Sequence, residues 1–266
     1  MSILIDKLNR ISRGSPQPMG FTSRQPASDK PKMQLVVSFA AESAGSLAGR
    51  AAGADAGLLR ISKPGTGAEA LQEISKTLPN IAWGVGLRGI SRAGLKQIAR
   101  AGSDFVVFPA TDTPLTALED NKTGRILEVP ESLDEGLFRA INQLPVDAVL
   151  VVCEEKESPV LTWQNLILCQ RLAGLLTKPL LVSVPSQVTA PELVSLWETG
   201  VAAVVIEITE KQPVDSLKKL RQAVDKLEFA SPRGPERAEA RLPRTGGTTS
   251  PASTGDDEEE EDEEEY

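Results

Sequence analysis

The chain has 266 residues, of which 40% are hydrophobic and only 4% aromatic, so aliphatic side chains must form its core. The sequence has no run of about 18 apolar residues, so no membrane span is predicted. Residues 1–20 lack the continuous apolar segment of a secretory signal. The two cysteines, Cys153 and Cys169, do not suggest a disulfide framework and favour a reducing cytoplasm.

The net charge of −8 comes from the C-terminus, where residues 256–265 are ten consecutive acidic residues. Residues 232–255 hold four arginines and two glutamates, so removing both stretches from 29 basic and 37 acidic residues leaves 25 of each. A neutral body offers no basic surface to a phosphate backbone, which argues against a nucleic-acid partner.

The first predicted element is a short amphipathic helix over residues 1–11, with Leu4, Leu8 and Ile11 on one side, able to cover one end of the domain. Residues 14–32 are rich in Pro, Ser and Gly and have no periodicity, so we predict a linker there. We take residues 1–32 as an N-terminal helix and linker.

From Leu35 onward, short apolar runs alternate with segments of helical periodicity. Eight short apolar runs predict buried strands at 35–39, 57–61, 81–85, 105–108, 125–129, 148–153, 180–184 and 203–208. Helical patterns follow them at 43–52, 68–78, 91–101, 114–121, 132–144, 162–176, 191–199 and 213–229. Helices that join buried strands indicate right-handed βαβ crossovers in a parallel sheet.

Eight βα units between residues 33 and 230 predict an α/β fold, a compact (β/α)8 barrel. An open doubly wound sheet is the alternative. After residue 230 the chain is rich in Pro, Arg, Gly, Ser and Thr and then acidic, a composition that buries too little apolar area to offset the entropy of ordering. We therefore predict a disordered tail over residues 231–266.

Two stretches carry a family resemblance. The later βα units of the ribulose-phosphate-binding, aldolase-type barrels resemble Thr189-Ala-Pro-Glu192 and the turn Gly200-Val-Ala-Ala-Val-Val205. A middle unit of these barrels resembles the earlier stretch that begins with Gly84-Val-Gly86. Thiamine-phosphate synthases, keto-deoxy-phosphogluconate aldolases and tryptophan synthase alpha chains are of that kind. The resemblance implies a TIM barrel over about residues 35–229 with its site at the carboxyl ends of the strands.

The sequence departs from these families at their phosphate loops. Glycines that follow strands seven and eight let backbone amides approach a phosphate there. This chain has Pro185-Ser186-Gln187 and Glu207-Ile208 instead, whose side chains block that approach, and Glu207 would repel a phosphate dianion. The resemblance therefore implies the fold but not the usual phosphate ligand.

Three charged residues lie within otherwise apolar strands: Arg60, Glu128 and Glu207. Buried charges are costly unless paired, so we expect them to meet at the barrel mouth, with Arg60 facing one or both carboxylates. Paired carboxylates beside a cation can act as acid and base, which makes these three the catalytic candidates. A structural ion pair, or side chains that point outward, is the alternative.

Further polar residues follow the predicted strands, and a ligand could bind to them: Lys63, Arg88, Asp112 and Ser186. No metal site is predicted, because the chain has no histidine and no Asp-x-Asp cluster, and no cofactor is predicted either. Cys153 has no histidine to activate it and is interpreted as a small buried side chain.

Two function hypotheses remain open. One is an enzyme, a lyase or isomerase acting on a small organic molecule at the carboxyl end of the barrel. The other is a non-catalytic barrel that serves as a binding or scaffold module, with its acidic tail contacting a basic partner. The predicted helix 162–176 is apolar over a broad face, at Leu166, Ile167, Cys169, Leu172 and Leu176, which suits either barrel packing or a homodimer interface.

Overall fold

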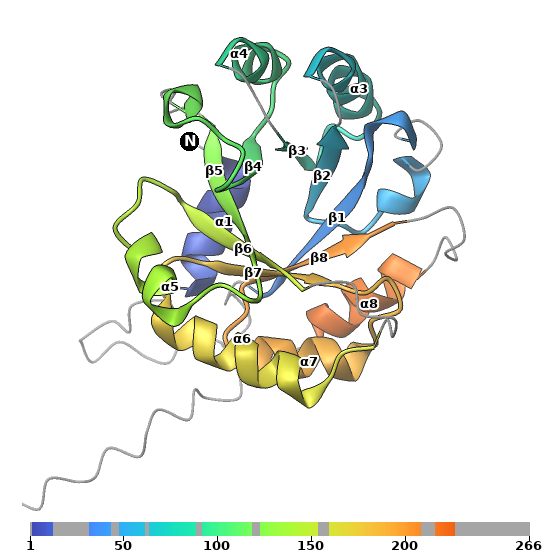
Figure 1. The fold of residues 1–266 in the computed structure, drawn as a ribbon. Helices are drawn as coiled ribbons and strands as arrows, with labels where there is room; N and C mark the ends of the chain where they lie inside the picture. Colours follow the sequence, from blue (N-terminus) through green and yellow to red (C-terminus); the bar gives the residue numbers. More distant parts are fainter. Residues whose placement is uncertain are drawn as a thin grey trace, which may run out of the picture. The chain divides into compact units, whose positions relative to one another are not determined.

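Strands and helices alternate along the chain in the computed structural model, which describes residues 2–12, 32–43, 48–61, 64–88, 92–118, 123–153, 160–208 and 216–226 (Figure 1). The strands are β1 Gln34–Ala40, β2 Ala56–Ile61, β3 Ala82–Leu87, β4 Phe105–Pro109, β5 Gly124–Pro130, β6 Ala148–Val152, β7 Leu180–Val184 and β8 Ala203–Glu207. The α-helices are α1 Ile3–Ser12, α3 Pro64–Thr77, α4 Arg92–Arg100, α5 Glu135–Ile141, α6 Trp163–Leu175, α7 Ala190–Glu198 and α8 Ser216–Asp225, with 3-10 turns η2 Ala41–Ser43, η3 Ala48–Ala51 and η4 Leu115–Leu118.

The eight strands form one closed parallel barrel in sequence order. The ring closes between the first strand and the last, where Val36 lies beside Val205 and Ser38 beside Glu207. This pairing confirms the predicted (β/α)8 barrel and rules out the open doubly wound sheet. Each predicted strand overlaps an observed one.

Two predicted helices coincide with 3-10 turns where the structure describes them. The interval predicted as one helix over residues 43–52 starts at the last residue of η2 and includes η3, and the described residues of the interval 114–121 include η4. Glycine lowers helix propensity by about 1 kcal/mol relative to alanine, and Gly49 lies within the first interval. Lys63 and the predicted tail from residue 231 lie outside the described residues, as do residues 44–47 and 119–122.

Apolar side chains pack in two layers, as the alternation of a strand requires. Val36 points into the ring, where it packs with Leu58, Phe105 and Leu150. Residues one position along, such as Val37, pack outward under the helices. The strands are therefore buried on both faces, which explains why they read as continuous apolar runs.

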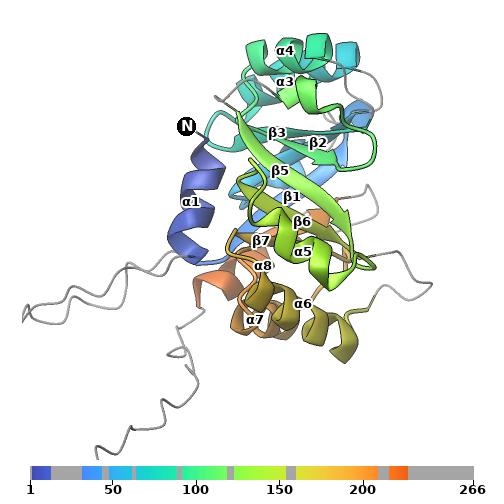
Figure 2. The same cartoon turned by 60° about the vertical axis from the view of Figure 1, so that its left-hand side comes forward.

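Helix α1 lies against one end of the ring (Figure 2). Leu4 and Leu8 are fully buried and pack with the residues inside the barrel. Asp104, just before β4, accepts hydrogen bonds from the amides of Ile3 (2.7 Å) and Leu4 (3.0 Å), so a carboxylate occupies the N-terminus of the helix, where it is favoured. The N-terminal helix thus closes the amino end of the barrel and leaves the carboxyl end as the mouth. Among the described residues, no helix has the length and apolar composition of a transmembrane span.

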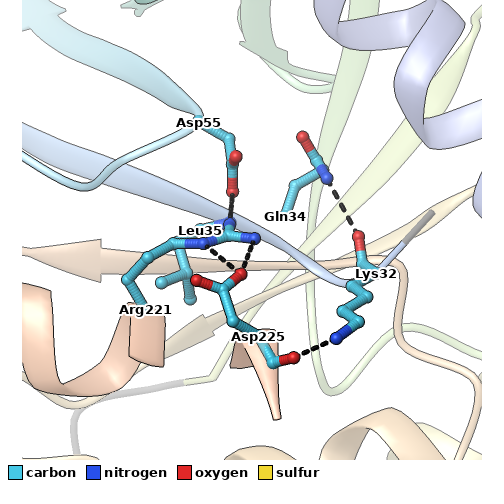
Figure 3. Close-up of polar contacts among 6 residues, drawn as sticks. All are labelled: Lys32, Gln34, Leu35, Asp55, Arg221 and Asp225. Atoms are coloured by element: carbon cyan, nitrogen blue, oxygen red, sulfur yellow. Dashed lines mark hydrogen bonds and ion pairs between the residues drawn. The ribbon is translucent and has the colours of Figure 1, made fainter. Parts of the chain in front are cut away.

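A polar cluster joins the last helix to the first two strands (Figure 3). Asp55, just before β2, accepts from the backbone amide of Leu35 at 2.9 Å and from Nη1 of Arg221 on α8 at 2.5 Å. Arg221 also donates to Asp225. Burial opposes the charge of Arg221, but hydrogen bonds to Asp225 and the charges of both carboxylates outweigh it and raise the pKa of Arg221. Contacts between residues 166 positions apart thus reinforce the closure of the ring.

The substitution Asp55→Ala tests this cluster. Removing the carboxylate leaves the Arg221 guanidinium, whose side chain is 24% exposed, without its inner partner and the Leu35 amide without an acceptor. We expect the free energy of unfolding in urea to fall by about 1–3 kcal/mol. Asp225→Ala is the control: that side chain is 56% exposed, so the loss should stay within about 1 kcal/mol. Equal effects of the two substitutions would contradict the assigned role of Asp55.

Candidate functional site

A cavity of about 410 Å³ opens at the carboxyl ends of the strands. Its lining comes from the ends of strands β1 to β5: Ala40, Arg60, Ile61, Gly86, Leu87, Arg88, Pro109 and Glu128. We call this cavity the mouth pocket. Strand alternation places two of its charged residues on the inner face, because Arg60 lies two positions beyond Leu58 and Glu128 two beyond Ile126, and both apolar residues are inside the ring.

Arg60 and Glu128 form an ion pair across the mouth pocket, with 3.5 Å between Nη1 and Oε2. The Arg60 side chain is 34% exposed and that of Glu128 14%. Nε of Arg60 also donates to Oγ of Ser38 at 3.2 Å, and Ser38 is 2% exposed. A buried hydroxyl and a carboxylate therefore hold the guanidinium from two sides. The predicted pairing of Arg60 with a carboxylate is present in the structure.

Arg88 stands at the rim of the mouth pocket, one residue beyond β3, and its side chain is exposed. Among the described residues it has no hydrogen bond and no ion pair. Among its described lining residues the pocket thus brings together two guanidinium groups and one carboxylate, with a net charge of about +1. An anion is the ligand that such a lining favours.

The other predicted site residues lie elsewhere. Glu207 ends β8 on the inner face, two positions beyond the inward-facing Val205, and is exposed. Asp112 is exposed in the turn after β4. Ser186 lines a separate cavity after β7. Of the described residues that line the mouth pocket, none is one of these three. Lys63 belongs to the part of the chain that is not described.

The barrel is similar to solved structures of other proteins. A mutant alpha subunit of tryptophan synthase from Pyrococcus furiosus superposes with a TM-score of 0.58 at 13% identity, over 74% of this chain and 98% of that one. A second mutant of the same subunit gives 0.59 at 13% identity, over the same shares of the two chains. The tryptophan synthase complex from that organism gives 0.56 at 13% identity, again with 74% and 98% covered. This chain has the fold of an aldolase-type TIM barrel. No family model matches the sequence, and no curated protein does.

TIM barrels commonly bind phosphate beside the last two strands. Here the described residues of that corner leave a cavity of only about 10 Å³, lined by Arg50, Ser186 and Ser216 together with apolar side chains such as Ile206 and Leu217. That volume accommodates about one water molecule. It agrees with the departure from the phosphate-binding glycines noted in the sequence.

Sequence reasoning missed Ser38. The residue lies within the apolar run of β1 and was counted as part of a buried strand. A hydroxyl among aliphatic residues is a signal for a buried hydrogen bond, because a buried polar group needs a partner.

Gly84 has a packing role: a Cβ there would lie 2.3 Å from the Phe105 ring, which fills the barrel interior.

The two cysteines differ in exposure. Cys169 on α6 is 2% exposed, and burial raises the pKa of its thiol to about 12. Cys153, directly after β6, is half-buried and packs at the edge of the outer apolar layer. Cys169 is thus inert packing, and Cys153 is more open than the sequence predicted.

Arg60→Met tests the ion pair. The substitution keeps the length of the side chain but leaves Glu128 without its cation, so we expect the free energy of unfolding to fall by about 1–2 kcal/mol. The loss is smaller than for a fully buried pair because Arg60 is about a third exposed. The double substitution Arg60→Met with Glu128→Leu removes both charges and should recover most of this loss. A double variant no more stable than Arg60→Met alone would contradict the pairing.

Alkylation tests the two thiols. At pH 8 iodoacetamide should modify Cys153 of the folded chain and leave Cys169 unmodified, because burial holds its proton and blocks access. In urea both should react, which intact-mass measurement detects as one adduct against two. Modification of Cys169 at the same rate as Cys153 in the folded chain would contradict the burial.

Proposed function

We propose that the mouth pocket binds a small organic anion and that Glu128 transfers a proton to and from it, as in lyase or isomerase chemistry. One observation carries the proposal: Arg60, Arg88 and Glu128 line a single cavity at the carboxyl end of a closed barrel. Sites of this fold lie at that end.

The charges of the lining favour an anionic ligand. Arg60 uses Nε and one Nη for Ser38 and Glu128, and a guanidinium has five N–H donors, so it can donate further. Arg88 has no partner within the described ranges and can bind a carboxylate or phosphate through two parallel hydrogen bonds. Together they suit a ligand with at least one anionic group.

The size and the apolar part of the lining suit a short carbon skeleton. Ligand pockets usually measure about 300–1,000 Å³, and this one, at about 410 Å³, is near the lower end. Ala40, Ile61, Leu87 and Pro109 supply hydrocarbon surface beside the charges. A substrate with a few carbon atoms and a terminal anionic group fits both features.

Glu128 is the proton-transfer group of the proposal. Its Oε2 faces Arg60, and the described residues give it no other hydrogen-bond partner. Histidine, the commonest general base, does not occur in the sequence. Lyase and isomerase reactions commonly use a base that takes a proton from carbon or oxygen and an acid that gives one to the product or the leaving group. Glu207, at the end of β8, remains a second candidate for acid or base.

The comparisons add support only at the level of the fold. The structural neighbours are alpha subunits of an enzyme named for a small-molecule product, at 13% identity. The second candidate function is a barrel that binds without turnover. The corner beside β7 and β8 favours that reading, because its described residues leave a cavity of only about 10 Å³, too small for a phosphate group. The tail as a contact arm for a basic partner stays a prediction.

Binding is tested first, by calorimetry with the best ligand from a thermal-shift screen of small carboxylates and phosphorylated compounds. Arg88→Ala should weaken that ligand about 10- to 100-fold, the effect of losing a charge-assisted hydrogen bond. Arg100→Ala, which removes an exposed arginine at the far end of α4, should leave the affinity unchanged. Equal affinity of Arg88→Ala and the unmodified chain would reject the anion site.

Turnover is tested separately, by following exchange of substrate hydrogen for deuterium in D2O by NMR. Glu128→Gln keeps the size of the side chain but cannot accept the proton, so exchange should fall by at least about 100-fold while binding persists. Binding with no exchange in the unmodified chain would favour the non-catalytic barrel instead. Exchange unaffected by Glu128→Gln would remove Glu128 from the proposed mechanism.

A further inference from the structure

Helix α6 lies on the outside of the ring (Figure 1). It presents an apolar stripe to solvent. Trp163 is 82% exposed and Ile167, one turn later, is 68% exposed. Val160, just before the helix, is 56% exposed. Single exposed apolar residues are ordinary, but a tryptophan and an isoleucine on successive turns of one face form a patch of the kind that marks a protein interface.

The inward face of α6 is a separate surface. Cys169, Leu172 and Leu176 are buried in the outer apolar layer of the barrel. Leu166 is half-buried and packs against the same layer, so four of the five apolar residues predicted for the broad face of this helix serve barrel packing. Of the five, only Ile167 is exposed to solvent, and Trp163 is exposed beside it.

The exposed stripe has a large side chain, Trp163, at its N-terminal end and no side chain, at Gly174, near its C-terminal end. Residues 163, 167, 170 and 174 lie within about 60° of one another around the helix, and all four are exposed. The last is Gly174, where an added Cβ would meet nothing within 4 Å. Trp163 and Gly174 are 11 residues apart, which separates them by about 16 Å along one face.

This shape is complementary to itself. Consider two copies of α6 that pack antiparallel about a two-fold axis passing between residues 168 and 169. Each residue of one copy then lies opposite the residue of the other copy for which the two residue numbers add up to 337. Trp163 of each copy then lies over Gly174 of the other, and Ile167 lies opposite Gln170. A two-fold interface uses the same surface on both subunits, so a protrusion and a hollow on one helix satisfy its requirement.

The charge of the stripe permits self-association. The only charged residue of α6 is Arg171, and it is paired with Glu135 of the neighbouring α5. Glu135 also pairs with Arg139, and Asp134 adds a second carboxylate beside Arg171, so two arginines face two carboxylates there. Two copies therefore approach without a net like charge on this face. A standard protein interface buries about 1,600 Å² of accessible surface in total. The two indoles alone would bury about 300–500 Å².

We propose that the chain forms a two-fold homodimer in which α6 packs antiparallel against its copy, with the Trp163 indole seated over Gly174. The interface lies on the outer helices, so the proposal is independent of the mouth pocket. Dimerisation buries the most exposed aromatic side chain among the described residues.

The test measures the mass of the full chain by sedimentation equilibrium over a range of micromolar concentrations. The unmodified chain should dimerise. Trp163→Ala removes the protrusion and should raise the dimer dissociation constant at least about tenfold. Gly174→Trp fills the hollow, so that two indoles collide, and should have a similar effect. Leu115→Ala, at a 94% exposed residue of η4, is the matched control and should leave the constant unchanged.

The double substitution Trp163→Ala with Gly174→Trp exchanges the protrusion and the hollow, so it should restore the dimer that either single substitution weakens. Both positions are exposed, and thermal melting checks that each variant folds; Trp163→Gln replaces Trp163→Ala if that variant does not. An unmodified chain that stays monomeric would overturn the proposal. So would a dimer that resists both single substitutions, or a double variant as weak as the singles.

Discussion

Backbone pairing between β1 and β8 is the constraint on which the rest of the structure depends. Five residue pairs, from Gln34 beside Ala203 to Ser38 beside Glu207, turn a parallel sheet into a ring. Closure brings the carboxyl ends of all eight strands to one mouth, so residues far apart in sequence line one pocket. Arg60 and Glu128, separated by 68 positions, meet only because the ring is closed and staggered in this register.

The two ends of the ring are finished differently. The amino end is sealed by apolar packing, since α1 inserts Leu4 and Leu8 among the residues that fill the barrel. At the mouth the inward positions change from aliphatic to polar: Ser38 follows Val36 and Arg60 follows Leu58. A buried charge is tolerated there because a carboxylate and a hydroxyl compensate it. One end therefore stabilises the fold, and the other is free to hold a ligand.

Much of this could be predicted from residue patterns. Strands buried on both faces are continuous aliphatic runs, which are easy to locate, and eight of them separated by helices allow few architectures. Charged residues inside such runs pointed to the Arg60–Glu128 pair, because a buried charge needs a partner. The contact of Asp55 with Arg221 was not predictable, since both residues are ordinary surface types and 166 positions separate them. The hydrogen bond of Ser38 to Arg60 was not predicted either, because a single small serine does not interrupt the apolar pattern of a buried strand. The sequence left open whether the broad apolar face of α6 packs on the barrel or forms an interface, and the structure shows that most of that face packs on the barrel while Ile167 faces outward.

The central claim is that the barrel mouth attracts small anions through Arg60 and Arg88. Crystals soaked in 3-bromopropionate, with data collected at the bromine absorption edge, test it most directly, because the anomalous signal distinguishes bromine from the protein and solvent atoms. An anion-binding mouth predicts an anomalous peak inside the pocket, with the carboxylate within hydrogen-bonding distance of the Arg88 guanidinium, and the loss of that peak in Arg88→Ala crystals. Bromine located only outside the mouth, or a peak that persists without Arg88, would contradict the claim.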